Sequence, residues 1–565
     1  MIKVWSNIRR LDSRGQRGFS VVEVLLAATV FGFLVVGLIG ALIYGRQSTA
    51  SSGEHRQAVH LAEEGLEATR NIAGSSFANL TDGTYGLSHV TNQWAFSGAS
   101  DTTGMFSRQV TIASAGSERK TITSTVTWSK MGGGTGTVTL TSRLTNWEEA
   151  IIVPITTGPI MMAYSKTTTT PFYRTWNGTA WSAEAAAQNV IGNINYVVLK
   201  SSRTRNEAIL GVQTSTGAIY VQVWNGSSWG NLTQVGTGPT TTRSFDIAYE
   251  KNGDRAVIAY SSGADFAYRI WNGATLSAAT AVTAPPTTGT VNWMELRQNP
   301  LSASNDVAMI MLDANADVYG MLWNGTSWNN MGVTTAWDTT AASAAKKTID
   351  VEYEQNSGRA MFMWGDSVAT DQYYRIWNGT TLTPAALLDI ATAGGLAEWV
   401  QLAARPNSNE IMLGVQDAGA DLNTRKWSGT AWDTATQHAE HSATVENITS
   451  RVFDIIWETN GANSGKAWLL WGDSLTITAK QWSGTAWGAG SVLSGSDDTS
   501  FIRLRADPTS GAVFAGVYED STSATDDIWE SRLTGGSAAW TAKNIIWDGP
   551  TGTTPVFFRI DIATP

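Results

Sequence analysis

The sequence predicts a mainly β protein, in which a long N-terminal helix and a small antiparallel sheet precede a β-propeller of eight blades, with the C-terminal strand closing the first blade. Three observations carry this prediction: an uncharged apolar run near the N-terminus, short alternating segments after it, and a tryptophan–glycine motif that recurs along the rest of the chain. With 565 residues, the chain is long enough for more than one domain.

Composition excludes several classes of function. Charged residues make up 15% of the chain, against roughly 25% in a typical soluble domain. The chain has no cysteine, so it has no disulfide, thiolate metal site or thiol nucleophile. Its formal net charge of −10 argues against nucleic acid as a partner, because such binding needs a basic surface. The low charge suits an exported β-rich protein.

The N-terminus predicts a membrane anchor. Residues 1–18 hold five basic side chains against one acid, and from Val24 to Tyr44 there are 21 residues without a charge. That length crosses a hydrocarbon core as a helix, and the basic flank keeps residues 1–18 on the cytoplasmic side. A cleaved signal peptide fits badly, because its apolar region is shorter and a small-residue cleavage site follows it.

The string RGFSVVE at residues 17–23 resembles the cleavage and methylation site of type IV prepilins and type II secretion pseudopilins. The resemblance implies that a prepilin peptidase cuts after Gly18 and methylates the new N-terminus at Phe19. It also implies that Glu23 acts in assembly by pairing with the N-terminal amine of a neighbouring subunit. A carboxylate within a span costs about 2.5–3.5 kcal/mol, and an ion pair makes it tolerable. The alternative is an interfacial glutamate that snorkels.

The remaining patterns divide the chain into domains. Apolar residues follow a helical rhythm from Ala58 to Ile72, and three segments with alternating β-branched and polar residues follow them. We therefore expect a leader (1–18), a pilin-like domain (19–148), a linker (149–158) and an eight-bladed propeller (159–565). The pilin-like domain comprises a transmembrane helix (19–45), an amphipathic helix (46–73) and a small β-sheet (76–148).

A repeat dominates the propeller region. Its core is a tryptophan, then asparagine or serine, then glycine, with copies 47 to 55 residues apart. The copies begin at Trp176, Trp224, Trp271, Trp323, Trp377, Trp427 and Trp482, with a degenerate one at Trp529. Asn-Gly or Ser-Gly between aromatic segments indicates a tight hairpin. Each period holds four strand-like pieces, which is typical of a propeller blade. The first period lacks one strand, which the C-terminal segment Val556 to Ile562 supplies.

Two sets of side chains are candidates for ligand binding. The second aromatic residue of five motifs follows the turn, where it is better placed for exposure than the first, which we expect in the core; these are Trp181, Trp229, Trp328, Trp432 and Trp487. At two-blade intervals a cation precedes the motif tryptophan by two residues; these are Arg174, Arg269, Arg375 and Lys480. They pack against tryptophan between blades, or they form a charged ring that meets an anionic ligand.

The sequence indicates no enzyme, cofactor or metal site. His438 and His441 flank Glu440, but a third ligand at matching spacing is lacking. Asp313 and Asp317 belong to an Asp-x-Asn-x-Asp segment without the glycine and glutamate of a calcium loop, so a polar hairpin is expected.

The resemblance and the repeats together predict a minor type IV pilin, located at the tip of the pilus. It would display a β-propeller for adhesion to a glycan or protein surface, with several weak sites acting together. Its partners would be other pilin subunits, the prepilin peptidase and the membrane. It would lie in the inner membrane before assembly and on the extracellular pilus afterwards. A type II secretion pseudopilin with a cargo-binding propeller, a membrane-tethered propeller lectin or hydrolase, and a structural cap of the filament remain alternatives.

Overall fold

The chain divides into two compact units, Met1–Val153 and Pro154–Pro565, with the division inside the expected linker. The computed structural model describes residues 20–75, 77–90, 93–115, 119–130, 133–145, 160–166, 168–283, 289–368, 371–390, 395–434, 438, 440–446, 450–459, 465–473, 476–493, 499–519, 527–534, 539–549 and 560–564. The leader, with Gly18 and Phe19, and the linker itself lie outside the described residues.

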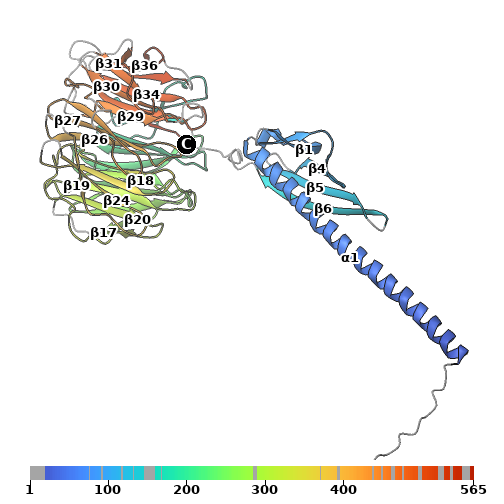
Figure 1. Ribbon diagram of the computed structural model, residues 1–565. Helices are drawn as coiled ribbons and strands as arrows, with labels where there is room; N and C mark the ends of the chain where they lie inside the picture. The colour runs from blue at the N-terminus through green and yellow to red at the C-terminus, as the bar shows by residue number, and fades with distance from the viewer. Residues whose placement is uncertain are drawn as a thin grey trace, which may run out of the picture. The chain divides into compact units, whose positions relative to one another are not determined.

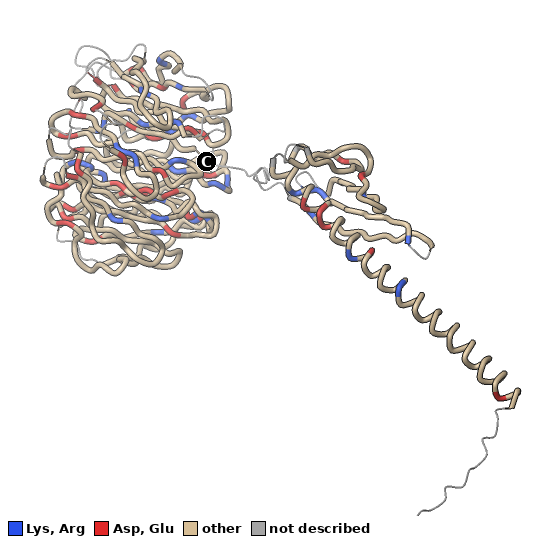
Figure 2. The backbone as a smooth tube through the Cα atoms, in the orientation of Figure 1, with Lys and Arg blue, Asp and Glu red and all other residues tan. Residues whose placement is uncertain are grey.

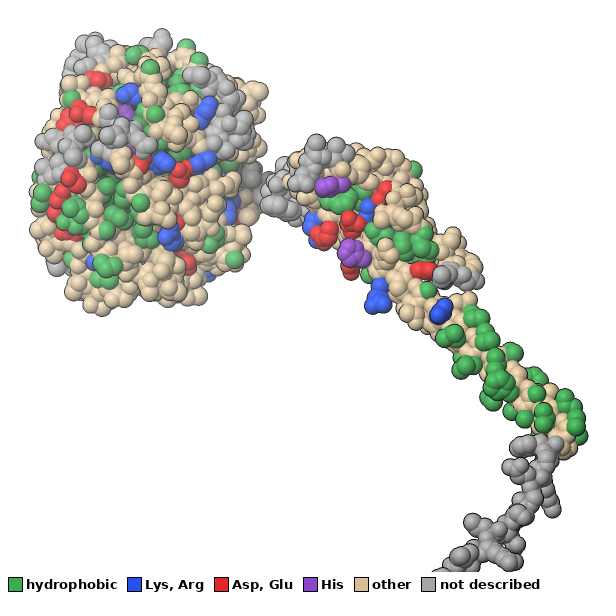
Figure 3. Space-filling view, in the orientation of Figure 1, with side chains coloured by type: hydrophobic (Ala, Val, Ile, Leu, Met, Phe, Trp, Pro, Cys, Tyr) green, Lys and Arg blue, Asp and Glu red, His purple; other side chains and the backbone are tan. Residues whose placement is uncertain are grey.

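The first unit begins with one long helix, α1 (Val21–Ser75) (Figure 1). Within the described residues it is the one helix that is long and apolar enough to cross a membrane. Apolar side chains from Val21 to Tyr44 are exposed, and they cover the first half of the helix in the space-filling view (Figure 3). The predicted transmembrane and amphipathic segments therefore form a single continuous helix.

Six antiparallel strands follow the helix. They are β1 (Gly83–Val90), β2 (Gln93–Ser97), β3 (Asp101–Thr103), β4 (Phe106–Ser114), β5 (Arg119–Ser129) and β6 (Thr135–Thr145). The sheet order is β2-β1-β4-β5-β6, with β3 paired to β4. In β4 and β5 buried and more exposed positions alternate, as the sequence pattern predicts for a sheet with one covered face. The small antiparallel sheet expected in this region is therefore present.

The second half of α1 covers this sheet. Ala58 and Ala62 of the helix are fully buried against Val126 of β5. Gly65 permits the close approach, because a Cβ there would lie 2.4 Å from the Ser124 hydroxyl oxygen. The helix therefore has two different halves: an exposed apolar one, and one whose apolar face belongs to a small core.

A buried arginine ties the helix to the sheet. Arg108 on β4 donates to the Leu61 carbonyl oxygen and to the Glu64 carboxylate, both at 3.1 Å. Its guanidinium also donates to both carboxylate oxygens of Asp101, at 2.6 and 3.2 Å. Charge-assisted bonds of this kind are stronger than neutral ones. They fix the rotation of α1 over the sheet.

The second unit consists of repeated antiparallel sheets. Their strands are β7 (Met161–Ser165), β8 (Pro171–Thr175), β9 (Ala185–Ala186), β10 (Ile194–Ser201), β11 (Ala208–Thr214), β12 (Ala218–Trp224), β13 (Trp229–Thr237), β14 (Phe245–Tyr249), β15 (Ala256–Ser262), β16 (Asp265–Trp271), β17 (Thr280–Val282), β18 (Val291–Gln298), β19 (Val307–Asp313), β20 (Val318–Trp323), β21 (Trp328–Asn329), β22 (Ile349–Tyr353), β23 (Ala360–Gly365), β24 (Asp371–Trp377), β25 (Ala386–Asp389), β26 (Ala397–Ala404), β27 (Ile411–Asp417), β28 (Leu422–Trp427), β29 (Phe453–Trp457), β30 (Ala467–Asp473), β31 (Thr476–Trp482), β32 (Ser491–Leu493), β33 (Thr499–Ala506), β34 (Val513–Glu519), β35 (Asp527–Leu533), β36 (Asn544–Asp548) and β37 (Ile560–Ala563). Most sheets take four strands in chain order, such as β14-β15-β16-β17, and β26-β27-β28 has three among the described residues.

These sheets have a propeller-like arrangement (Figure 1). The first strands of successive sheets contact one another in the order β37, β10, β14, β18, β22, β26, β29 and β33, and β33 also contacts β37. Apolar clusters fill the space between neighbouring sheets; one of them joins Met161 and Ala163 of β7 to Val197 and Leu199 of β10. The core therefore lies mainly between sheets, as the apolar content of the inner strands requires.

The last strand completes the first sheet. β37 pairs antiparallel with β7, with Ile560 opposite Tyr164, so that sheet has the order β37-β7-β8-β9. The described part of the C-terminal strand therefore belongs to the first sheet. It joins residues from the two ends of the unit.

The repeated turn is the predicted hairpin. In the first copy, Trp176 and Trp181 pair across the turn, and the Asn177 side-chain oxygen accepts hydrogen bonds from the backbone N–H groups of Thr179 and Ala180 at 2.9 and 2.8 Å. Gly178 has a φ of 98°, a left-handed conformation that favours glycine. The glycines of the six later copies from Trp224 to Trp482 also have a positive φ, between 92° and 106°. The backbone conformation of this turn therefore requires the Asn-Gly or Ser-Gly pair of the motif.

Candidate functional site

The five tryptophans predicted to bind ligand pack against aromatic rings of their own hairpin and of other segments. Each lies beside the first tryptophan of its motif, with ring centroids 5.5 to 5.8 Å apart. Trp229 is 9% exposed, and Trp181, Trp328, Trp432 and Trp487 are half-buried. Binding at these residues stays a prediction.

The first tryptophans of most motifs belong to the core, as expected. Trp323 donates its indole N–H to the Glu250 carboxylate at 2.7 Å, and Trp427 donates to Glu354 at 2.8 Å. Both glutamates lie at the end of an inner strand, so each bond joins one sheet to the next. Arg255 forms a salt bridge with Glu250 at 2.6 Å, which leaves that buried carboxylate paired.

The four predicted cations lie on the third strands of four different sheets, β8, β16, β24 and β31. Arg174 donates to the carbonyl oxygens of Ser182 and Ile546, at 3.2 and 2.9 Å, and Arg269 donates to that of Ser277 at 3.1 Å. Arg375 lies 5.2 Å from the ring of Trp337, and Lys480 lies 5.3 Å from that of Trp471. The rings beside them differ from the motif tryptophans that the sequence suggested. A common anionic ligand for this set remains a prediction.

The structure brings together a different set of charges on the inner strands. Four aspartates occupy equivalent positions, each as the second residue of its described strand; they are Asp246, Asp350, Asp454 and Asp561. One oxygen of each carboxylate accepts the backbone N–H of a leucine on the next sheet, at 2.7 to 3.0 Å; these leucines are Leu296, Leu402, Leu504 and Leu199 respectively. The other oxygen accepts the N–H of the following residue. Each aspartate therefore joins two neighbouring sheets.

A first group of cations lies three residues before three of these aspartates: Arg243, Lys347 and Arg451. Arg243 and Arg451 pair with Asp246 and Asp454 at 3.3 and 2.9 Å. Lys347 lies 3.6 Å from the Asp350 carboxylate. All three cations are buried, so each charge needs a partner inside the protein.

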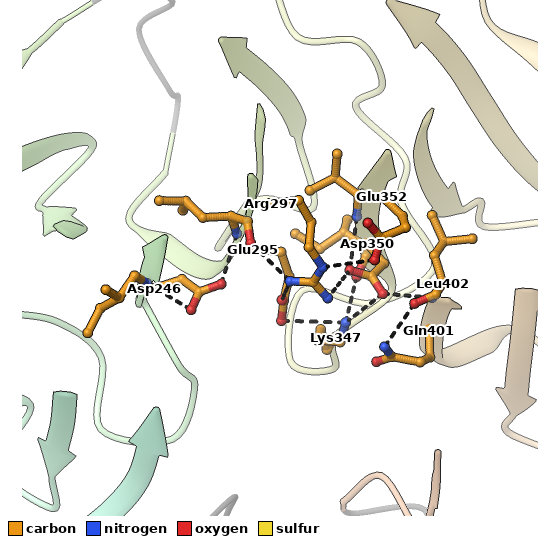
Figure 4. A network of polar contacts seen from close by, with 12 residues as sticks. Asp246, Glu295, Arg297, Lys347, Asp350, Glu352, Gln401 and Leu402 are labelled. Atoms are coloured by element: carbon orange, nitrogen blue, oxygen red, sulfur yellow. Dashed lines mark hydrogen bonds and ion pairs between the residues drawn. The ribbon is translucent and has the colours of Figure 1, made fainter. Parts of the chain in front are cut away.

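A second group of cations comes from the alternate inner strands. Arg297 on β18 contacts Asp350 at 3.2 Å and Glu352 at 3.4 Å, both on β22 (Figure 4). Arg505 on β33 contacts Asp561 at 3.3 Å, and Lys200 on β10 lies 4.0 Å from Asp246. The equivalent residue of β26 is Ala403.

Glu295 is the point where these groups meet. Its carboxylate accepts from Arg243, and it pairs with Arg297 at 3.1 Å and with Lys347 at 3.4 Å (Figure 4). Burial alone would raise the pKa of Glu295, but the charges of Arg243, Lys347 and Arg297 hold that pKa well below its usual range. The acid therefore stays ionised within the protein.

Two cations of this network have a lowered pKa, and burial is the first cause for both. Burial lowers the pKa of Lys200 to about 8, against the attraction of Asp246 and Asp561. Burial and the charge of Arg503 lower the pKa of Arg505 to about 10. Figure 2 shows charges of both signs distributed through the strands of this unit.

A cavity opens at the end where the inner strands finish. Two adjoining parts of it, of about 310 and about 370 Å³, share the lining residues Lys200, Arg203, Arg297 and Arg505. We call these four residues the cavity cations. The acid in the lining is Glu352, which already pairs with Arg297. Sequence reasoning missed this group, although its signal was present: a basic residue ends the inner-strand motif in YVVLK, WMELR and FIRLR.

The histidine pair lies in a buried polar cluster. His438 contacts the Asp433 carboxylate and the Thr424 hydroxyl, at 2.7 and 2.8 Å, and the same hydroxyl contacts His441 at 2.8 Å. Burial, Lys480 and His438 lower the pKa of His441 to about 3. Within the described residues there is no group of three or more ligating side chains that could hold a metal ion.

The Asp-x-Asn-x-Asp segment is a polar hairpin, as expected. The Asp313 carboxylate accepts backbone N–H groups of Asn315 and Asp317, at 2.9 and 3.0 Å, and that of Gly289 at 2.7 Å. Asp417 makes the same turn with Gly419.

No family model and no curated protein matches the sequence. Solved structures that resemble the chain include a mutant of the Aleuria aurantia lectin in complex with Fucα1-6GlcNAc, with a TM-score of 0.36, 11% identity, and coverage of 64% of this chain and 97% of that one. AofleA from Arthrobotrys oligospora has a TM-score of 0.35, 12% identity, and coverage of 65% and 89%. The dihydro-heme d1 dehydrogenase NirN has a TM-score of 0.44, 8% identity, and coverage of 72% and 76%. These likenesses are distant, and they assign no function to the chain.

Proposed function

We propose that the chain is a minor pilin-like subunit that displays a β-propeller binding module outside the cell. The observation that carries the proposal is the division of α1: its first half exposes apolar side chains with one acid, Glu23, and its second half belongs to a small folded unit. Such a helix is suited to insert first in a bilayer and then among identical helices. The Gly-Phe junction before it, with the acid four residues beyond, adds the resemblance to prepilins.

Glu23 has a local partner as well. Its carboxylate accepts the Ser20 backbone N–H at 3.1 Å, which is half of a capping box at the start of α1. One carboxylate oxygen remains for an amine of a neighbouring subunit. The charge at this position is costly in lipid, so pairing on assembly would favour the filament over the dispersed membrane form.

In this proposal the repeated sheets are the eight blades of a closed propeller, with β37 completing the first one. Support comes from the order of contacts along the first strands and from the β37–β7 pairing. A closed ring leaves no inner sheet edge exposed. Its repeated turns present equivalent surfaces, which suits multivalent adhesion to a glycan or protein surface. We propose binding rather than catalysis as its activity.

Mass analysis of the mature protein tests the anchoring half of the proposal. Sheared surface filaments should contain a chain that begins at Phe19 and carries one extra methyl group. A chain in those filaments that begins at Met1 would overturn the processing step. A chain that is processed but stays in the periplasm would favour the type II secretion pseudopilin.

Deletion of residues 154–565 tests the display half. The shortened chain should still enter filaments, because α1 and its sheet form a separate unit, but adhesion of the cells should fall. Unchanged adhesion would favour the structural cap. The full chain should also bind a component of a glycan array or of a host-cell surface.

A further inference from the structure

We propose that the cavity at the end of the inner strands binds a small organic oxyanion, a carboxylate or a phosphate ester, through the cavity cations Lys200, Arg203, Arg297 and Arg505. This site is separate from the tryptophan hairpins and from α1, and it does not depend on assembly into a filament. It adds a chemically defined ligand class to the propeller unit.

The first argument is the imbalance of charge at the cavity. The four cavity cations come from three sheets and from the turn after β10. The lining of the cavity includes one acid, Glu352. That acid already pairs with Arg297 at 3.4 Å. Several cations that converge on one cavity attract anions, because low-dielectric walls focus their field.

The second argument is that nearby carboxylates are already engaged. Asp246 pairs with Arg243 at 3.3 Å and accepts the Leu296 N–H, while its distance to Lys200 is 4.0 Å. Asp561 accepts from Arg503 at 2.7 Å, closer than its 3.3 Å contact with Arg505. Lys200 and Arg505 therefore retain donor capacity toward the cavity.

Arg203 extends the same positive surface outward. Its side chain is exposed, and the nearby Asp254 carboxylate is held by Arg205 and by the Ser202 hydroxyl, both at 2.7 Å. Burial and the charge of Arg203 lower the pKa of the adjacent Lys251 to about 8. An anion in the cavity would relieve this repulsion.

The third argument is size. Parts of about 310 and about 370 Å³ fall in the range of small-molecule sites, about 300–1,000 Å³. Arginine presents a planar donor fork that matches both carboxylate and phosphate oxygens. The site therefore fits a charged group attached to a body of about one sugar ring.

Calorimetric titration of the full chain in neutral detergent tests the proposal. The probes are glucuronate, glucose 6-phosphate and uncharged glucose, at low salt. Binding of either charged probe, with glucose at least tenfold weaker, is the expected result, and the stronger probe identifies the source of the oxyanion. Equal binding of all three, or binding of none, overturns the proposal.

Two single variants locate the site. Arg203→Gln and Lys200→Met should each weaken binding of the charged probe at least tenfold, with an unchanged unfolding temperature for Arg203→Gln because that side chain is exposed. Arg143→Gln is the matched control, since it removes an equally exposed arginine of β6 in the first unit, outside every candidate site, and it should bind as the parent does. Loss of binding in the control, with Arg203→Gln unaffected, would contradict the assignment.

Adhesion separates this proposal from the proposed function. If Arg203→Gln loses oxyanion binding and the cells still adhere, the cavity is a second site. If the parent protein binds no oxyanion and the cells adhere, the cavity proposal fails and the display function stands.

Discussion

At the scale of the residue, the structure assigns partners to charges that composition alone could not place. Glu23 combines a capping contact with exposure in an apolar helix. Lys200 has one long ion pair, at 4.0 Å, and a pKa lowered by burial. Both residues can be tested by single substitutions.

Glu23→Gln separates the two contacts of that residue. Glutamine still accepts the Ser20 N–H, so the start of α1 is kept, but it cannot pair with an amine as an anion. We expect normal membrane insertion and at least tenfold less subunit in the sheared filament fraction, measured by immunoblot. Glu23→Ala should give the same loss. If the glutamine variant assembles as the parent does, the carboxylate charge has no role in assembly.

The lowered pKa of Lys200 predicts that the stability of the folded chain depends on pH. Its pKa is about 8 in the folded chain, below the usual value of about 10.4, so the unfolded chain binds more protons between these values. Stability should therefore rise as pH increases from about 8 to about 10, as the penalty on the buried ammonium is removed. The unfolding temperature, recorded at several pH values, measures this rise in stability. Lys200→Met should abolish this rise, and an identical rise in the variant would exclude Lys200 as its cause.

The pKa of Lys200 also predicts how pH affects oxyanion binding in the cavity. Asp246 and Asp561 favour the charged form of Lys200, and Arg297 and Arg505 oppose it. A bound oxyanion adds to the favourable side, so its affinity should fall as pH rises through about 8. Titration of glucuronate and glucose 6-phosphate at pH 7 and pH 9.5 measures this change, and a rising affinity would contradict the role of Lys200.

At the scale of the element, the inner strands are joined by side chains as well as by packing. Asp350 on β22 accepts the Leu402 N–H of β26 at 2.7 Å and contacts Arg297 of β18 at 3.2 Å. One carboxylate therefore connects three successive sheets. Because the residues involved are about 50 positions apart, no local pattern in the sequence reveals the connection.

Asp350→Ala should be strongly destabilising. The substitution removes a negative charge that pairs with Lys347 and Arg297, and it leaves the Leu402 N–H without its acceptor. Loss of one partner of a buried ion pair costs about 3–5 kcal/mol of stability. Denaturant unfolding measures the change. Glu440→Ala is the control, because that carboxylate is exposed, and it should shift stability by less than about 0.5 kcal/mol. A similar small shift for Asp350→Ala would mean that the carboxylate does not join the sheets.

What the sequence could predict followed from local periodicity. The helix, the sheet that covers Ala58 and Ala62, the four-stranded repeats and the Asn177–Gly178 turn all depend on residues close together in the chain. The contacts between side chains could not be predicted from the sequence, because they depend on the register between sheets. Arg375 accordingly lies over Trp337 rather than Trp377, and the cavity cations were not foreseen as a group.

At the scale of the whole molecule, the chain joins a helix that can enter a membrane to a separate unit of repeated sheets. Each unit has its own core, because the apolar clusters that contain α1 include only residues of the first unit. The two units should therefore unfold independently, and a fragment of residues 155–565 should be a soluble monomer. Size-exclusion chromatography measures this, and an insoluble fragment would contradict it.

Removal of residues 555–565 tests how the ends of the second unit are joined. The deletion removes β37 and leaves β7 without its partner, and it also removes Asp561, which contacts β10 and β33. We expect a lower unfolding temperature and a tendency to associate through the exposed edge. Deletion of residue 565 alone is the control. Unchanged unfolding after the longer deletion would show that β37 adds no stability.

The four aspartates of the inner strands stand 104 or 107 positions apart, and each binds forward to the sheet that follows. Strands with such an aspartate alternate with strands that lack it. Gain or loss of about a hundred residues, the length of two sheets, would keep this alternation, so each aspartate would still meet a strand of the same type. Gain or loss of half that length would set two acidic strands side by side, with like charges facing in a dry interior. Recombination during the history of such a gene should therefore have proceeded in steps of two sheets, and the closed ring proposed above requires an even number of them.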